Sequence, residues 1–144
     1  MNEYCYTLLY MERLNKLQKV DIFSPNETET ALITGIRPDT LDDCLRASMA
    51  ICSQTAVGYV VLKLGARGCY IYDGKYCDLI APFDVQAVDT TAAGDAFTAA
   101  LATEFLRTGD ITASARYANA VGALTVTTAA LPTRETVRRF LEQI

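Results

Sequence analysis

Apolar residues alternate along the chain between helical spacing and short unbroken runs, a pattern typical of an α/β protein. In the N-terminal part, this pattern predicts a helix over residues 4–18 and a short buried strand over residues 20–23. Ser24 and Glu27 offer a capping box, with Pro25 at the first helical position, and Gly35 is expected to end the helix that follows.

The middle of the chain predicts one further helix and then several strands. Asp39 or Thr40 is expected to cap the helix. Its apolar residues at helical spacing are Leu41, Leu45, Met49 and Cys52. Three β-branched and aromatic runs follow at residues 58–64, 69–72 and 76–80, separated by glycine-containing turns. They predict a central strand followed by antiparallel strands at one side of a sheet.

Three helices are predicted in the C-terminal part. The first follows residues 89–94 and ends at Gly109, the second begins at Ile111 or Thr112, and the last begins near residues 132–133. Their apolar stripes are formed by Phe97, Leu101 and Phe105, by Tyr117, Val121 and Leu124, and by Val137, Phe140 and Leu141. Helices that can cover both faces of an apolar sheet indicate a three-layer α/β/α architecture. Without an evident linker or repeat, we expect a single domain over residues 1–144.

Composition narrows the classes of partner and the compartment. The chain has 144 residues, of which 51% are hydrophobic and 21% charged, enough for one domain with a substantial core. Its net charge of −4, without a basic run interleaved with aromatics, argues against a nucleic-acid partner. No apolar run approaches membrane-spanning length, and the N-terminus lacks a basic region before an apolar one. We therefore expect a cytoplasmic protein without a membrane partner.

Two residue types limit the possible chemistry. The chain contains no histidine, which excludes Ser-His-Asp and Cys-His catalysis and histidine metal ligands. Its five cysteines are odd in number and form no Cys-x-x-Cys pair. We expect them to be buried free thiols in a reducing compartment.

The strongest chemical signal is a run of small residues between two aspartates, residues 89–97, at the start of a helix. Small side chains let a phosphate approach the backbone, and a helix N-terminus offers free N–H groups and a positive dipole end. Asp95 would stand beside that anion as a proton acceptor. The local sequence also allows an ordinary turn at Asp89 and a first-turn acid at Asp95 that complements the dipole. No P-loop motif is present.

Residues 89–101 resemble, without a gap, the C-terminal signature of the ribokinase-like (PfkB) carbohydrate kinases. That signature often reads Gly-Ala-Gly-Asp where this chain has Ala92, Ala93, Gly94 and Asp95. The resemblance implies that the N–H groups of residues 92–94 form an anion hole for the transferred phosphoryl group and that Asp95 is the catalytic base. Phosphoryl transfer depends mainly on positioning and charge neutralisation, which is consistent with these roles.

A second segment, residues 24–29, resembles the Asn-x-x-Glu motif of the same family, which acts on Mg²⁺ and phosphate largely through water. Asn26 and Glu29 occupy the two motif positions. Taken alone, the segment also reads as a capped helix start, and both readings can hold together.

A third segment, residues 63–68, resembles the family segment that supports the nucleotide, with Gly65 and Gly68 at its glycines. Lys63 replaces the usual threonine and either adds an ammonium near phosphate or projects into solvent. An ordinary turn explains an isolated Gly-x-x-Gly equally well. The resemblance also places Asn119 on a helix that flanks the adenine, although a helical asparagine often simply faces solvent.

Asp89 and Thr91 match family positions that contribute to a monovalent-cation site, which binds K⁺ in many members. The rest of that site comes from a glycine-containing loop before the last helix. Residues 127–133 form a shorter segment that lacks this glycine, so activation by K⁺ stays open.

The resemblance extends from about residue 20 onward but covers only the C-terminal half of the family's usual length. It implies a truncated ribokinase-like sheet without the N-terminal part and lid, preceded by an atypical helix at residues 1–19. The implied function is transfer of phosphate from MgATP to the hydroxyl of a sugar or sugar acid, with ribose, fructose and 2-keto-3-deoxygluconate all open. The alternative is a catalytically inactive nucleotide-binding or structural fragment. Exposed strand edges favour a homo-oligomer or pairing with a missing N-terminal half.

Overall fold

The computed structural model describes residues 20–144, which divide into two compact units that we treat separately. The sheet unit contains residues 20–65 and Tyr70–Leu79, and the helical unit contains Ala66–Cys69 and Ile80–Ile144. The helix predicted over residues 4–18, and Cys5 within it, lie outside the described residues. The elements in chain order are β1 (Val20–Phe23), α2 (Glu27–Thr34), α3 (Leu41–Gln54), β2 (Val57–Lys63), a 3₁₀ turn (Gly65–Arg67), β3 (Cys69–Tyr72), β4 (Cys77–Ile80), α4 (Ala93–Thr108), α5 (Ile111–Thr128) and α6 (Arg134–Glu142).

The strands described here form one sheet in the order β1-β2-β3-β4. Strands β1 and β2 are parallel, with Val20 opposite Val57 and Ile22 opposite Tyr59. The connections from β2 to β3 and from β3 to β4 are too short for a crossover, so these pairs are antiparallel. The prediction of a central strand followed by antiparallel strands at one side is confirmed.

Strand β1 differs from its prediction in burial. It lies at an edge of the sheet that residues 20–144 form, and Asp21 is exposed while its neighbours in the strand are only partly buried. The apolar residues of the central strand β2, by contrast, include the fully buried Val60, Val61 and Leu62. Edge position rather than apolar content therefore decides how deeply a strand is buried here.

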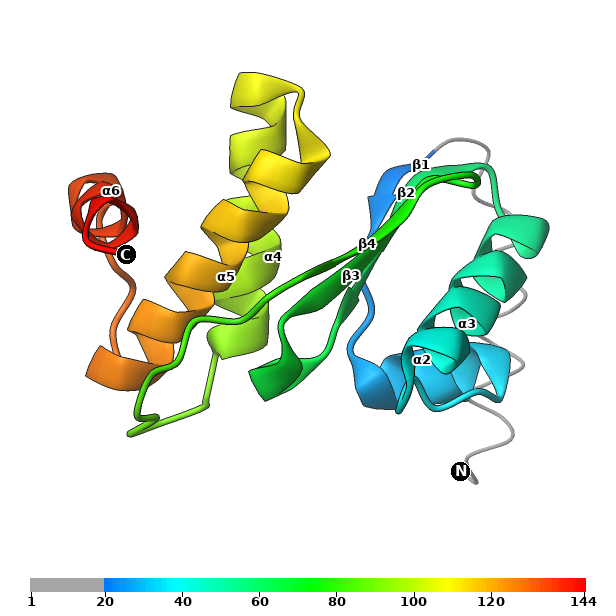
Figure 1. Ribbon diagram of the computed structural model, residues 1–144, viewed down its shortest axis with the longest axis horizontal. Helices are drawn as coiled ribbons and strands as arrows, with labels where there is room; N and C mark the ends of the chain where they lie inside the picture. Colours follow the sequence, from blue (N-terminus) through cyan, green and yellow to red (C-terminus); the bar gives the residue numbers. More distant parts are fainter. Residues whose placement is uncertain (1–19) are drawn as a thin grey trace. The chain divides into compact units, whose positions relative to one another are not determined.

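Helices α2 and α3 lie on the same face of the sheet and contact each other and β2 (Figure 1). Thr40 caps α3 in a capping box with Asp43, as one of the two predicted caps. Of the predicted apolar series of α3, Leu45 and Cys52 pack against the core, whereas Leu41 and Met49 are more than half exposed. The fully buried residues of α3 are Cys44, Ala47, Ser48 and Ile51.

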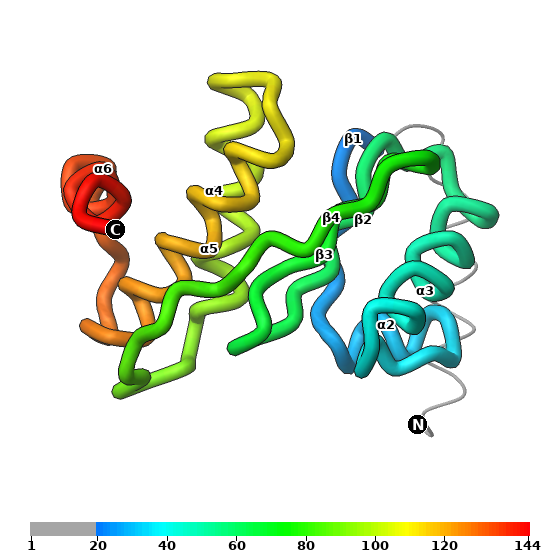
Figure 2. The backbone as a smooth tube through the Cα atoms, viewed as in Figure 1, coloured from blue at the N-terminus to red at the C-terminus, as the bar shows by residue number. Residues whose placement is uncertain are grey.

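In the helical unit, α4 and α5 form an antiparallel pair and α6 packs on α5 (Figure 2). Gly109 ends α4 in the left-handed conformation, as predicted. Phe97 and Leu101 of the predicted stripe are buried, and Val137 lies in a core shared with Phe140. None of the helices within residues 20–144 combines the length and the apolar character needed to cross a membrane.

The cysteines in the described part of the chain only partly follow the expectation of burial. Cys44 and Cys69 are buried and Cys52 is partly buried, but Cys77 is exposed. Cys77 is the first residue of β4, whose outward-facing positions alternate with buried ones at the sheet edge. The prediction of a buried thiol is therefore wrong for Cys77.

A buried carboxylate ties α4 to α6. Glu104 is 5% exposed. Its two oxygens accept hydrogen bonds from Arg107 at 2.5 Å and from Arg134 at 2.9 Å. The guanidinium of Arg134 also lies 5.2 Å from the centre of the Tyr117 ring on α5. The hydrogen bonds from Arg107 and Arg134 lower the pKa of Glu104, whereas its burial opposes that shift.

We predict that Glu104→Gln lowers the free energy of unfolding by about 1–2 kcal/mol near pH 7, because two guanidinium groups lose their anionic partner. A carboxyl whose pKa is lowered by folding stabilises the protein above its ordinary pKa, here 4.5, and loses that contribution as the pH falls through the folded-state value. The difference in the free energy of unfolding between wild type and Glu104→Gln should therefore be constant from pH 6 to 8 and become smaller below about pH 4.5.

Urea unfolding across this pH range measures the effect. Glu135→Gln is the matched control, because Glu135 pairs with Arg138 and Arg139 on the exposed side of α6. This control should change stability little. An equal loss in both variants would contradict a special role for Glu104.

Candidate active site

The predicted site residues fall into two groups, one in each unit. The sheet unit contains Asn26, Glu29, Lys63 and Gly65. The helical unit contains Gly68, Asp89, Thr91, Ala92, Ala93, Gly94, Asp95 and Asn119. Within each unit the structure brings several of these residues together.

Asn26 and Lys63 lie side by side at the carboxyl ends of the two parallel strands. The ladder continues beyond β1, since the Lys63 N–H donates to the Pro25 carbonyl at 2.9 Å and Asn26 pairs with Lys63 in a parallel bridge. Ser24 adds a bond from its hydroxyl to the Val61 carbonyl at 2.9 Å. The carboxyl ends of parallel strands are where open α/β sheets bind their ligands.

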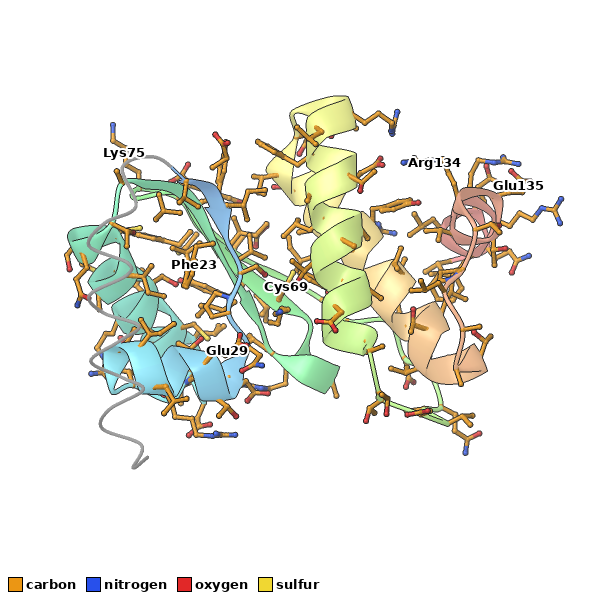
Figure 3. The ribbon with its side chains drawn as sticks, turned by 180° about the vertical axis from the view of Figure 1, so that it is seen from behind. Phe23, Glu29, Cys69, Lys75, Arg134 and Glu135 are labelled. Carbon is orange, nitrogen blue, oxygen red and sulfur yellow. The ribbon has the colours of Figure 1, made fainter. Side chains whose placement is uncertain are left out.

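Asn26 and Glu29 form the capping box at the start of α2, where Figure 3 labels Glu29. The Asn26 side-chain oxygen accepts from the Glu29 N–H, and the Glu29 carboxylate accepts from the Asn26 N–H, each at 2.8 Å. The predicted box between Ser24 and Glu27 is therefore wrong. The helix begins later than predicted because Pro25 is still held in the parallel ladder.

Two glycines flank the 3₁₀ turn and both need positive φ angles. Gly65 has φ +57°, and a Cβ there would meet Glu27 at an ordinary 3.6 Å. Gly68 has φ +90°, and a Cβ there would lie 2.1 Å from the Ile80 carbonyl oxygen. Close backbone packing thus explains Gly68 without a ligand.

The segment before α4 is held to the end of α5. The N–H groups of Val88 and Asp89 both donate to the Val126 carbonyl, at 2.8 and 3.0 Å. The Asp89 carboxylate then accepts from the Thr91 N–H at 2.8 Å, and this bond lowers the pKa of Asp89. Asp89 is therefore anionic at neutral pH and shapes the turn that precedes Ala92.

Ala92 is the N-cap of α4 and adopts the left-handed conformation, with φ +63°. This conformation costs an alanine about 1 kcal/mol and a glycine almost nothing. This difference in cost explains why the signature that residues 89–101 resemble often has a glycine at this position. No local pattern around residue 92 indicated this strained conformation.

Helix α4 starts without a side-chain cap, unlike the other helices in residues 20–144. Those helices are capped by Asn26, Thr40, Asp110 and Thr133. The first backbone bond of α4 runs from the Ala96 N–H to the Ala92 carbonyl at 2.9 Å, so α4 itself does not use the N–H groups of Gly94 and Asp95. The Ala93 N–H makes a long turn bond of 3.4 Å to Thr90. Such a helix start suits an external anion.

Asp95 is the third residue of α4 and is exposed. Its carboxylate thus belongs to the same first turn as the amides of residues 93 and 94. One element therefore presents both the uncapped amides and an exposed carboxylate.

Asn119 does not face solvent, contrary to the simpler expectation. Its side chain is buried at 9% exposure, and its amide nitrogen donates to the carbonyls of Ile80 and Ala81 at 3.2 and 3.1 Å. No pattern in the sequence linked α5 to residues 80 and 81, because the partners lie far apart along the chain and are backbone atoms.

The expected loop at residues 127–133 is shorter than predicted. Thr127 and Thr128 are the last residues of α5, and Ala129 ends the helix with φ +54°. The irregular connection to α6 thus begins only at Ala129.

Residues 5–134 match the model of the pfkB family carbohydrate kinases. The chain belongs to this family. Ribokinase from Haemophilus influenzae is 32% identical over 130 residues, which cover 88% of this chain and 42% of that protein. Ribokinase from Arabidopsis thaliana is 34% identical over 133 residues, covering 88% of this chain and 35% of that protein.

Solved structures confirm the ribokinase-like α/β fold of this pfkB-family chain. The structure of Arabidopsis thaliana ribokinase complexed with ribose and ATP matches with a TM-score of 0.79 and 32% identity, covering 85% of this chain and 41% of that chain. The chain thus spans about two fifths of the length of these relatives.

We predict that Gly68→Ala destabilises this pfkB-family chain by at least about 2 kcal/mol, because strain at a positive φ adds to the backbone clash. Gly74→Ala is the matched control. Gly74 has a similar φ of +98°, but a Cβ there would meet nothing within 4 Å. Thermal and urea unfolding should show a clearly smaller loss for the control. Equal losses would mean that the contact with Ile80 adds nothing.

Ala92→Gly should stabilise the chain by about 0.5–1 kcal/mol, because relief of left-handed strain outweighs the entropy that glycine adds to the unfolded state. Ala93→Gly, one residue later inside α4, should instead destabilise by about 0.5–1 kcal/mol. Urea unfolding of both variants distinguishes the two positions. A loss of stability in Ala92→Gly would show that the left-handed conformation is unstrained.

Proposed function

We propose that this chain provides the nucleotide side and the catalytic aspartate of a kinase that transfers phosphate from ATP to a sugar hydroxyl. The observation that carries the proposal is the start of α4, which has small residues, no side-chain cap and Asp95 in its first turn. Membership of a carbohydrate-kinase family supports the reaction class.

In this proposal, the first-turn amides of α4 hold the transferred phosphoryl group. The N–H groups of residues 92–94 and the positive end of the helix dipole neutralise charge that develops on the phosphoryl oxygens. Because these donors are backbone groups at a fixed helix start, they need little reorganisation during transfer. Positioning of this kind contributes roughly 7–11 kcal/mol in well-oriented reactions.

Asp95 is the proposed base. Its carboxylate would accept the proton of the attacking hydroxyl while the amides beside it stabilise the phosphoryl group. A loose transition state requires the proton only late, so an exposed carboxylate is suited to the task.

The sheet unit is proposed to serve the magnesium ion and the nucleotide phosphates. Asn26 and Glu29 offer an amide and a carboxylate, and oxygen ligands are those that Mg²⁺ prefers, directly or through water. The capping box uses one oxygen of each side chain, so Glu29 has a second oxygen to offer. Lys63 lies beside Asn26 at the same strand ends, and Gly65 follows it. When bound, Mg²⁺ would neutralise phosphate charge.

A monovalent cation such as K⁺ is proposed near Asp89 and Thr91. The support is that the Asp89 carboxylate is held anionic by its bond from the Thr91 N–H. Its second oxygen can still contact a cation. The connection to α6 that begins at Ala129 would supply the remaining contacts to this cation.

The substrate side of the reaction is also a proposal. The chain spans about two fifths of the relatives it matches, and we assign none of its residues to the sugar. We propose that residues 1–144 act as one C-terminal kinase domain. A second copy or a separate N-terminal half would then complete the sugar site. Ribose is a reasonable first substrate to test, since ribokinases are among the relatives.

We predict that Asp95→Asn lowers sugar-dependent turnover of ATP by at least about 100-fold, because the proton acceptor is lost. MgATP affinity should stay within about threefold or become tighter, since the amides that bind phosphate are unchanged. Calorimetric titration and a coupled kinase assay with ribose and fructose measure the two quantities. Asp84→Asn, which removes an exposed carboxylate outside the proposed site, is the control.

Two outcomes would contradict the proposal. Normal turnover in Asp95→Asn would rule out the base. Binding of MgATP by wild type without any turnover, also after an N-terminal half of a pfkB-family kinase is added, would identify the chain as an inactive nucleotide-binding fragment.

A further inference from the structure

Residues 81–92 connect β4 to α4 without regular secondary structure. Most of them are exposed, so they have little core of their own. The position of such a segment depends on its anchors to neighbouring elements. Because the segment leads directly into the start of α4, its anchors also determine how the phosphate-binding turn is held.

The first anchor is the Asn119 side chain. A carboxamide nitrogen has two N–H donors, and both point to successive backbone carbonyls, those of Ile80 and Ala81. Both bonds are within the normal distance range, at 3.2 and 3.1 Å. The group is buried, so losing either bond would leave a carbonyl without its donor.

Two more anchors hold the middle and the end of the segment. The Phe83 ring packs edge-on against Phe140 of α6, with 5.2 Å between ring centres, and Arg116 of α5 lies over it at 5.6 Å. At the end, the Val126 carbonyl accepts the N–H groups of residues 88 and 89. Asn119 and Val126 are two helical turns apart and so lie on the same side of α5.

We infer that Asn119 is a positioning residue for the phosphate-binding turn at residues 89–95. Helix α5 acts as a template that holds the connecting segment at its two ends, with Asn119 at one end and Val126 at the other. Since both Asn119 donors are used by the backbone, the residue acts through Ile80 and Ala81 rather than by donating to the adenine. The expected effect of Asn119 on ligand binding rests on the proposed function. The anchoring of the segment by Asn119 does not depend on it.

The test compares two ligands that share a polyphosphate chain and differ in the base. MgATP and magnesium tripolyphosphate are titrated against wild type, Asn119→Leu and the control Thr127→Val. Leucine keeps the number and branching of the side-chain heavy atoms of asparagine and its neutrality, and it removes both donors. The Thr127 hydroxyl donates within α5 to the Ala123 carbonyl, so the control changes the same helix without touching the segment.

Asn119→Leu should weaken both ligands by the same factor, about tenfold, because the shared phosphate site is disturbed. The control should bind both as wild type does. A loss confined to MgATP would show that Asn119 contacts the base and would overturn the inference. Unchanged affinity for both ligands would overturn it as well.

Amide hydrogen exchange provides a readout that needs no ligand. In Asn119→Leu, the Val88 and Asp89 amides, which donate to the Val126 carbonyl, should exchange about tenfold faster relative to the buried Leu101 amide of α4, which reports general destabilisation of the same unit. Equal acceleration at Leu101 would mean that Asn119 acts only on overall stability. If wild type binds neither ligand, the proposed function fails, while this measurement still decides the anchoring.

If Asn119→Leu does not fold, the inference is tested on the wild-type protein by nuclear magnetic resonance. The Asn119 side-chain amide protons should exchange slowly in the free protein, as expected for buried bonded groups. On saturation with MgATP, they should keep their chemical shifts and show no nuclear Overhauser contact to the adenine protons. Fast exchange or a contact to adenine would contradict the inference.

Discussion

The antiparallel packing of α4 on α5 is the constraint on which the helical unit depends. The two helices meet near the start of α4, where a Cβ added to Gly122 would lie at an ordinary contact distance of 4.0 Å from the Ala93 carbonyl oxygen. This brings the start of α4 next to the end of α5, where the Val126 carbonyl holds the backbone of residues 88 and 89. The same helix carries Asn119 two turns earlier. Loosening this pair would therefore disturb the segment 80–92 at both of its ends.

In the sheet unit, a different interaction positions the start of a helix. Its parallel ladder extends past the last residue of β1, so Pro25 and Asn26 stay aligned with Lys63 until the chain turns into α2. The capping box then follows at once, with Glu29 as the reciprocal partner. Asn26 takes part both in strand pairing and in helix capping, so its structural role is compatible with the magnesium role that we propose for it.

Local signals were sufficient for much of the fold. Gly109 and the apolar stripes of α4, α5 and α6 were predicted correctly, because a left-handed cap and a repeating stripe are encoded by neighbours in the chain. The start of α2 was wrong because a ladder bond to Lys63 outweighed the local capping pattern. The burial of Asn119 and the left-handed Ala92 were missed for a related reason: each depends on tertiary packing. The assignment of roles came from the family signature, which local sequence alone left ambiguous.

The uncapped start of α4 has a consequence for how this site can vary over evolution. Its donors are peptide groups, which every residue except proline provides. Selection at residues 92–94 should therefore favour small side chains that do not accept hydrogen bonds from these N–H groups. Many small-residue combinations preserve the same chemistry, and a residue-by-residue comparison would underestimate how well the site is kept. Asp95 is the exception, since its proposed role as the base resides in its side chain, and substitutions there should be the informative ones among diverged copies.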